Sequence, residues 1–287
     1  MMDIGFIGAG KVGCSLGRFF KDSGLELTGY YSRQEEKAKE ACEFTKSRHY
    51  KTIKELVSDS DVIFLTVTDG AISSVFEQIK QFDINGKMIC HCSGAMTASE
   101  AFPGIDECGA LGYSIHPLFP VSSRFEAYKE LRDAFFCIEG DSRKIKVWED
   151  TLKNIGVRVR QIDGKNKIKY HAACAIASNL MCALVQESVD LLGVCGFDAR
   201  EALEALKTLS LNNLSHILSE GPREALTGPV ERNDVSTVLK HLNSFDSESE
   251  KKMYSELSLK LVDMASKKHP DRDYSDLKNT LSFTIGE

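Results

Sequence analysis

The chain has 287 residues, of which 42% are hydrophobic, so it is long enough for two domains of ordinary size. Its 36 basic and 42 acidic residues give a net charge of -6 and are spread along the sequence, which argues against binding to nucleic acid or to an anionic membrane. Nine cysteines without regular spacing are unlike a secreted disulfide framework and indicate reduced thiols.

The N-terminal sequence begins with the strand-like "DIGFIG" and not with a basic segment followed by an apolar signal core. No apolar run in the sequence approaches the roughly 20 residues that a membrane-spanning helix needs. We therefore expect a cytoplasmic protein.

Through about residue 162, short β-rich runs alternate with helical stretches. Near-continuous apolar strands joined by crossover helices predict an α/β fold, a doubly wound and mostly parallel sheet of the Rossmann type. The expected strands are residues 4–7, 25–31, 62–67, 87–92, 111–115, 134–138 and 158–162. The expected helices between them are residues 11–21, 34–43, 71–81 and 143–155.

After residue 162 the strand signal stops and only helical patterns follow, which predicts an all-α second domain. Asp198 and Ser247 mark helix starts, and Gly221 followed by proline marks a stop. The boundary is placed in "DGKNK", giving a nucleotide-binding domain at 1–162 and a helical substrate and dimerisation domain at 163–287. The expected helices are residues 167–192, 199–209, 211–218, 235–242, 247–267 and 274–282.

The first motif is "GAGKVG", which follows a strand and opens a helix with the spacing G-x-G-x-x-G. Gly8 permits the tight turn, Gly10 lets the backbone approach a pyrophosphate, and Gly13 lets the helix pack closely on the sheet. The free N–H groups at the helix start face the phosphate anion. An ordinary strand-to-helix turn is the competing interpretation. The residues expected to bind a dinucleotide here are Gly8, Ala9, Gly10, Lys11, Val12 and Gly13.

The choice between NAD and NADP depends on the end of the second strand, where an NAD site places an acid on the ribose 2′-OH. Ser32 and Arg33 stand there instead, offering a hydroxyl and a guanidinium suited to a 2′-phosphate. Glu35 and Glu36 are the competing residues, but we expect them in the first turn of the next helix, where the dipole favours acids. The sequence therefore predicts NADP.

Two further strand ends lie at the edge where a doubly wound sheet collects its ligands. The end of the 62–67 strand predicts cofactor contacts from Val67 and Thr68, whereas Asp69 is interpreted as a helix N-cap. The 87–92 strand predicts a contact from Ser93, and from Gly94 beside it.

The same strand holds a Cys-His-Cys run that resembles a metal site. Strand alternation sends His91 to the face opposite Cys90 and Cys92, so the three side chains do not converge on one point. We therefore expect no metal site in this chain.

His116 is placed at the end of the 111–115 strand and is followed by Pro117. An imidazole at this edge can titrate near neutrality and donate a proton to a substrate oxygen or nitrogen. A structural histidine bonded to the backbone is the alternative.

These motifs together resemble a known family. The glycine loop, "SGA" at 93–95, "HPL" at 116–118, "YHAACAIASN" at 170–179 and "ALTGPVERND" at 225–234 are similar to Rossmann-like proteins with the helical domain of unknown function 2520, which are described as NADP-dependent oxidoreductases. The architecture is more distantly similar to pyrroline-5-carboxylate reductase, ketopantoate reductase and the 6-phosphogluconate dehydrogenase group. The last motif commonly reads Arg-Gly-Asp, and here Asn233 replaces the glycine. Because Asn tolerates the left-handed conformation, the turn can survive.

The segment "KYHAACAIASN" raises the question of what its polar residues do among so many alanines. On a helix from residue 167, His171, Ala175, Ser178 and Asn179 share one stripe. The resemblance to two-domain dehydrogenases implies that this helix lines the substrate cleft, with His171 and Asn179 bonding the substrate. Alternatively, both residues link helices within the second domain. Lys169 and Tyr170 are other possible proton donors, but we expect Lys169 in solvent.

The hypothesis from these observations is an enzyme, an NADP-dependent oxidoreductase that transfers hydride between the nicotinamide and a carbonyl or imine carbon of a small polar metabolite. Its catalytic candidates are His116, His171 and Asn179, and the sequence does not decide which histidine donates the proton. The alternative is a non-catalytic NADP(H)-binding sensor or interaction protein. Similar enzymes dimerise through the helical region, which implies a homodimer.

Overall fold

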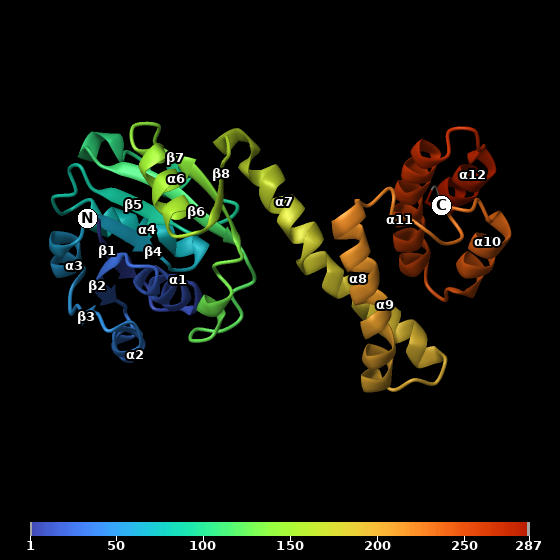
Figure 1. Cartoon of the computed structure of the whole chain (residues 1–287), viewed down its shortest axis with the longest axis horizontal. Helices are drawn as coiled ribbons and strands as arrows, with labels where there is room; N and C mark the ends of the chain where they lie inside the picture. Colours follow the sequence, from blue (N-terminus) through green and yellow to red (C-terminus); the bar gives the residue numbers. More distant parts are fainter. Residues whose placement is uncertain (1, 286–287) are drawn as a thin grey trace. The chain divides into compact units, whose positions relative to one another are not determined.

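The computed structural model describes residues 2–285 and divides into two compact units, Met1–Cys182 and Ala183–Glu287 (Figure 1). The unit division lies inside a helix, whereas the boundary expected from the sequence lies at residues 163–167, in the turn that precedes the long helical segment. The domain limits 1–162 and 163–287 therefore stay a prediction.

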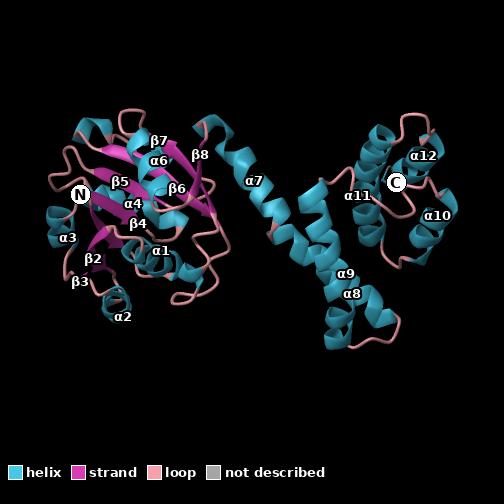
Figure 2. Ribbon diagram, viewed as in Figure 1, coloured by secondary structure: helices cyan, strands magenta, loops and turns pink. Residues whose placement is uncertain are grey.

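The first unit is built on an eight-stranded sheet within residues 2–285, with the strand order β3-β2-β1-β4-β5-β6-β7-β8 (Figure 2). Every neighbouring pair is parallel except β6 and β7. The expected doubly wound, mostly parallel Rossmann sheet is confirmed. The strands are β1 (Asp3–Ile7), β2 (Glu26–Tyr31), β3 (Arg48–His49), β4 (Val62–Leu65), β5 (Met88–His91), β6 (Leu111–Leu118), β7 (Phe135–Gly140) and β8 (Arg158–Gln161).

Helices cover both faces of this sheet because its central strands are apolar on both sides. One core contains Phe6, Phe64 and Trp148, and α1, α2 and α6 cover it. The other contains Leu65 and Phe76 and is covered by α3, α4 and α5. The helices are α1 (Lys11–Asp22), α2 (Glu35–Thr45), α3 (Ile53–Asp59), α4 (Asp69–Ile79), α5 (Ala98–Ala101) and α6 (Ile145–Asn154).

Three short elements, β3, α3 and the four-residue α5, are absent from the sequence-based expectation. The strand β3 is only Arg48–His49, too short and too polar to show a strand pattern. The helix α3 has seven residues, although its start carries a capping box between Thr52 and Glu55. That capping box is the signal that would have located α3.

The strand β6 is longer than expected, and this changes the position of His116. The sequence places His116 at the strand end, but β6 continues to Leu118, so His116 lies inside the strand and pairs with Cys137 of β7. The neighbour β5 pairs with β6 only as far as Ser114. Past that point one edge of β6 has no strand beside it, which is where a strand tolerates Pro117.

The helical region begins with α7 (Lys167–Ala177), which belongs to the first unit, and α8 (Asn179–Val194). The single expected helix 167–192 is therefore wrong, because the helix breaks at Ser178. The two expected helices 199–209 and 211–218 are one helix, α9 (Ala199–Glu220), because Ser210 does not interrupt it.

The second unit contains three further helices, α10 (Val235–Ser244), α11 (Glu248–Lys268) and α12 (Ser275–Ile285), around a core of their own. Asp198 and Ser247 cap α9 and α11 as expected. Within the described residues after β8 there are helices and no strand, so the all-α prediction is confirmed.

The motif at 225–234 forms a turn that leads into α10. Asn233 has φ +61°, the left-handed conformation expected for the residue that replaces glycine. Its amide Nδ2 also donates a hydrogen bond to the Asp273 carbonyl at 2.7 Å, a contact that glycine cannot make. Asp234 accepts from the Thr237 backbone N–H at 3.0 Å and caps α10. The motif is therefore structural within this unit.

The helical stretch Gly164–Val194 corrects one expectation about apolar runs. Its 31 residues include a window of mean hydropathy 1.4, long and apolar enough by composition to cross a membrane, and none of that window is buried. The sequence showed no uninterrupted apolar run because lysine and small residues punctuate it. One such helix is weak evidence for a membrane span, because helices at protein interfaces have the same composition.

Candidate functional site

The glycine loop between β1 and α1 is held against the end of β4. Gly8 has φ +112°, and a Cβ placed on it would lie 2.5 Å from the Thr66 carbonyl oxygen. A Cβ on Gly13 would lie 2.5 Å from the Gly8 carbonyl oxygen. The Thr66 hydroxyl donates to that same oxygen at 2.8 Å. Gly8 and Gly13 are therefore required by the turn and by the close seating of α1.

Gly10 differs from these two glycines, because a Cβ on it would meet no atom within 4 Å. It is exposed and forms the N-cap of α1 without a side-chain capping bond. Ala9 is buried, Val12 is half-buried and Lys11 is exposed at the first helical position. The residues present thus fit a dinucleotide, because an open backbone surface faces the N-terminal end of a helix.

The end of β2 carries the residues that the sequence assigns to a 2′-phosphate. Ser32 follows β2, and its hydroxyl accepts from the Gln34 backbone N–H at 3.2 Å, while Arg33 is exposed. Glu35 and Glu36 lie in the first turn of α2, as expected, and each carboxylate is 3.0 Å from the Lys39 ammonium. The competing acids are therefore engaged with a lysine of their own helix.

The loops after β4 and β5 are tied together. Asp69 is not the N-cap of α4, because Thr68 holds that position, exposed after a half-buried Val67. Asp69 is instead the first helical residue, and its Oδ2 accepts from the Ser93 hydroxyl at 2.6 Å. The Ser93 oxygen in turn accepts from the backbone N–H groups of Ala95 and Met96 at 3.3 and 3.1 Å.

His91 has a structural role in the same loop. Its Nδ1 accepts from the Ser93 backbone N–H at 3.1 Å, and burial lowers its pKa to about 3. Its ring packs against Phe102, whereas Cys90 and Cys92 face the opposite core, so the predicted alternation is confirmed. Among residues 2–285, no group of three or more His, Cys, Asp or Glu side chains is placed to hold a metal ion.

Two imidazoles meet over Gly94. A Cβ on Gly94 would lie 2.6 Å from His171 Cδ2 and 2.9 Å from His116 Nε2, so only glycine fits between these rings. His116 Nδ1 lies 2.6 Å from the Tyr170 hydroxyl. Burial, together with the charges of Lys167 and His171, lowers the pKa of His116 to about 4, although Asp69 acts in the opposite direction. His116 is therefore uncharged at neutral pH.

A cavity of about 340 Å³ opens beside these rings, within the first unit. The three predicted catalytic residues His116, His171 and Asn179 all line it, and Ser178, at the break between α7 and α8, lines it as well. Lys169 is exposed and is absent from the lining, as expected. The polar stripe in the alanine-rich helix thus faces a cavity at the carboxyl edge of the sheet.

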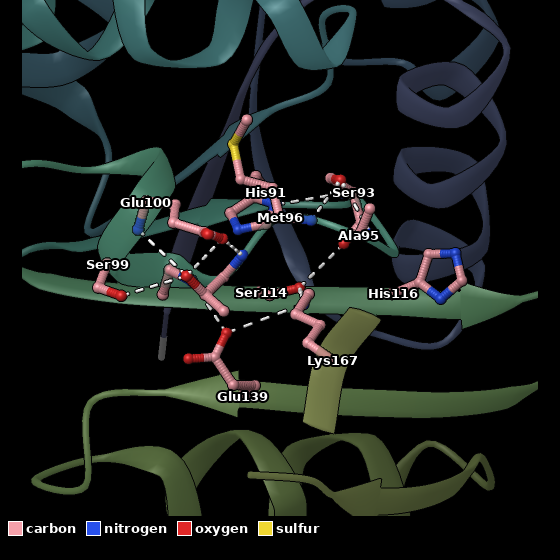
Figure 3. A network of polar contacts seen from close by, with 12 residues as sticks. His91, Ser93, Ala95, Met96, Ser99, Glu100, Ser114, His116, Glu139 and Lys167 are labelled. Carbon is pink, nitrogen blue, oxygen red and sulfur yellow. Dashed lines mark hydrogen bonds and ion pairs between the residues drawn. The ribbon is translucent and has the colours of Figure 1, made fainter. Parts of the chain in front are cut away.

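Lys167 is a residue of this region that the sequence analysis missed. It was assigned to a charged turn, yet it is only 1% exposed. Its ammonium donates to the Ser114 hydroxyl and lies 3.8 Å from the Glu139 carboxylate (Figure 3). Burial lowers the pKa of Lys167 to about 8, against the raising effect of Glu139. Nothing in "GKNKIK" separates this lysine from its exposed neighbours, because burial is decided by the sheet that α7 meets.

The contacts of Lys167 fix the start of α7 relative to the loop that carries Gly94. Ser114 donates onward to the Ser93 carbonyl at 3.2 Å, and Glu139 accepts from the Ala98 backbone N–H at 2.9 Å (Figure 3). Lys167 thereby joins β6, β7 and the 93–98 loop. His171, one turn further along α7, is held against that loop.

Comparison with known families agrees with this geometry. Residues 3–93 match the family described as NADP oxidoreductase coenzyme F420-dependent, and residues 134–261 match the domain of unknown function DUF2520. The N-terminal part of the chain is thus similar to an NADP oxidoreductase family and the C-terminal part to DUF2520. The resemblance inferred from the motifs is confirmed. No curated protein matches the chain.

Solved structures share the fold over most of this chain. Protein TM1727 from Thermotoga maritima is 25% identical, with a TM-score of 0.72 over 93% of this chain and 99% of its own. A reductive aminase from Aspergillus terreus, solved with NADPH and ethyl-5-oxohexanoate, is 14% identical, with a TM-score of 0.62 over 100% and 94%. Pyrroline carboxylate reductase from Plasmodium falciparum, solved with NADP, is also 14% identical, with a TM-score of 0.61 over 93% and 96%.

The buried Lys167 predicts a specific pH dependence of stability. Its pKa falls from 10.5 to about 8 on folding, so between these values the unfolded chain holds a proton that the folded chain has released. The free energy of unfolding therefore gains a contribution that rises with pH from about 8 to about 10.5. Urea unfolding at pH 7.5 and pH 9.5 should show a larger gain for the wild type than for Lys167→Met.

The matched control is Lys169→Met, which removes an exposed lysine from the same helix and should follow the wild-type pH dependence. If Lys167→Met and the wild type change equally between the two pH values, the buried lysine does not titrate as described.

Proposed function

We propose that this protein is an NADP-dependent oxidoreductase that transfers hydride between the nicotinamide and a carbonyl or imine carbon of a small molecule. The observation that carries the proposal is a continuous run of contacts along the carboxyl edge of the sheet. Gly8 contacts Thr66, Asp69 bonds Ser93, and the Gly94 backbone lies against the two imidazoles. An extended dinucleotide laid along this edge from the glycine loop leads to the cavity.

The cofactor assignment rests on residues at both ends of that edge. Gly10 offers the open backbone approach for the pyrophosphate, and Ser32 and Arg33 offer the 2′-phosphate contacts. The family description and the NADP or NADPH in two of the neighbours support the same cofactor. Val67, Thr68 and Ser93 are the proposed contacts further along.

His116 is the proposed hydrogen-bond donor to the reacting oxygen or nitrogen. Burial raises the pKa of Tyr170 well above its ordinary value, so its hydroxyl keeps its proton and donates to His116 Nδ1. The uncharged ring then carries its hydrogen on Nε2, the atom beside Gly94. A fixed N–H at this point stabilises negative charge that develops on the substrate heteroatom.

Bound NADPH supplies the hydride, and the side chains of the cavity orient the acceptor. His171 and Asn179 are proposed to bond the substrate from α7 and from the start of α8, because both line the cavity with His116. His171 is exposed, so water reaches this side of the cavity. Water is the proposed source of the proton that His116, held uncharged, does not supply.

We also propose a homodimer through the helical region. Among the described residues of α8 none is buried, and in α9 only Ala202 is. Leucines along these helices are instead strongly exposed, among them Leu209 at 69%, Leu211 at 57% and Leu218 at 77%. Apolar stripes of this length need a partner in water, and a second copy offers an identical one.

A cytoplasmic location is proposed with this assembly. All nine cysteines are free thiols, which suits a reducing compartment.

The cofactor assignment predicts a preference of the wild type for NADPH over NADH. Arg33→Ala should weaken NADPH binding by roughly tenfold or more and leave NADH binding unchanged, because a charge-assisted bond to phosphate contributes about 1.5–3 kcal/mol. Calorimetric titration of apo-protein with both nucleotides measures this. Equal or tighter NADH binding contradicts the 2′-phosphate assignment, and binding of neither nucleotide to folded protein contradicts the oxidoreductase itself.

The control for this titration is Gly10→Ala. Its added methyl meets no protein atom within 4 Å, so thermal stability should stay at the wild-type value while both nucleotides bind more weakly. Gly13→Ala should instead lower stability, because its methyl meets the Gly8 carbonyl.

The site assignment predicts that His116→Ala, His171→Ala and Asn179→Ala lower turnover and leave NADPH affinity intact. Loss of a fixed donor at the reacting atom costs roughly 10²–10³ in kcat. Tyr170→Phe should also lower kcat, because it removes the hydrogen bond that orients the His116 ring. Steady-state kinetics with an imine or ketone, beside calorimetric NADPH binding, measures both quantities.

Thermal unfolding of the same variants shows whether these side chains act on a substrate or only stabilise the fold. If the variants lose folded protein in proportion to their activity, these side chains link helices and do not serve a substrate. If NADPH binds but no carbonyl or imine is ever reduced, the protein is the non-catalytic sensor instead.

The homodimer predicts a mass twice that of the 31.8 kDa chain in sedimentation equilibrium. Leu211→Glu with Leu218→Glu should shift the equilibrium toward monomer, because both leucines are exposed on the same face of α9. Val147→Glu is the matched control, since Val147 is 41% exposed on α6. A monomeric wild type, or a wild type that sediments with membranes, contradicts the proposal.

A further inference from the structure

The wall of the cavity beside His116 is apolar on two sides. Past His116, β6 and the loop after it contribute Pro117, Leu118 and Phe119, while α7 contributes Ala175 and Ala177. Among the described residues that line the cavity, none is Asp, Glu, Lys or Arg. A ligand in this space therefore meets apolar surface and neutral hydrogen-bonding groups.

Within the described residues, the polar groups of the lining include no lysine or arginine. They are two imidazoles, the Cys174 thiol, the Ser178 hydroxyl and the Asn179 amide. Burial holds the pKa of His116 at about 4, so this ring carries no charge at neutral pH. Hydroxyl and amide groups can bond a carbonyl or an imine, but they leave the charge of an anion unbalanced.

Two charged side chains that act on the pKa of His116, Lys167 and Asp69, also fail to favour an anion. Lys167 is buried outside the cavity lining, and its ammonium is directed to Ser114 and Glu139. Asp69 carries a negative charge and raises the pKa of His116. A carboxylate or phosphate beside His116 would therefore find no lysine or arginine of the described lining to pair with.

We propose that this cavity selects small uncharged carbonyl or imine compounds with an apolar substituent, and that it rejects carboxylates and phosphates. The inference rests on the proposed function, because it names the substrate class of the same site. It separates this protein from reductases whose acceptor carries a carboxylate.

The first test measures binding and needs no turnover. NADPH-loaded protein is titrated with 2-pyrrolidinone and, separately, with pyroglutamate, which is the same lactam with one carboxylate. The readout is the shift of the His116 and His171 ring resonances, assigned with His116→Gln and His171→Gln. We expect the lactam to bind at least tenfold more tightly than its carboxylated form.

A positive charge introduced into the cavity lining tests whether the absence of a cationic side chain causes the preference for uncharged ligands. Leu118 lines the cavity and is 38% exposed, so Leu118→Arg can present a guanidinium to a ligand carboxylate. This variant should narrow or reverse the preference. Leu118→Gln, similar in length and uncharged, should keep the wild-type preference.

A parallel assay compares NADPH-dependent reduction of 2-methyl-1-pyrroline with that of 1-pyrroline-5-carboxylate. We expect kcat/KM to favour the imine that lacks the carboxylate by tenfold or more.

Wild-type binding of pyroglutamate that equals or exceeds that of the lactam overturns the inference, and so does the absence of ring shifts with either compound. If the lactam is preferred and Leu118→Arg removes the preference while no imine is reduced, the selectivity stands and the proposed reaction fails.

Discussion

The buried ammonium of Lys167 is the contact on which the arrangement of the site depends. Taking a lysine to 1% exposure is costly, and the structure offsets this cost with a hydroxyl from β6 and a carboxylate from β7. Both partners are also bonded to the 93–98 loop. These contacts fix the start of α7 against the edge of the sheet. The positions of Tyr170 and His171, one turn further along α7, depend on them.

The glycine loop could be predicted from sequence residue by residue because its requirements are local. A left-handed turn at Gly8 and close contact at Gly13 depend on backbone geometry within a few residues, and both are observed. Helical periodicity places His171 and Ala175 on one face of α7, but the break at Ser178 puts Asn179 on α8, so the predicted stripe holds only up to that break. Asn233 in the left-handed region belongs to this group as well.

Features that depend on distant neighbours could not be predicted in this way. In the sequence, Lys167 is one of several charged residues near a turn. Only its packing against the sheet makes it buried, unlike its neighbours. Asp69 reads as a helix cap, but its partner is Ser93 on the next loop. The extension of β6 past Ser114 depends on pairing with β7, which lies beyond a loop, so the strand position of His116 was misjudged. The break at Ser178 likewise carries no glycine or proline.

The electrostatic arrangement explains why an uncharged histidine suits this site. In the proposed reaction, a protonated His116 would lose its N–H when it gave up the proton, whereas an uncharged ring fixed by Tyr170 would keep an oriented donor. Burial is the main cause of the low pKa of His116, and the charge of Lys167 adds to it. The Lys167 ammonium is bonded to Ser114 and lies beside Glu139, so it lowers the pKa of His116 without lining the cavity. The buried lysine therefore acts on the site through position and charge and does not contact a ligand there.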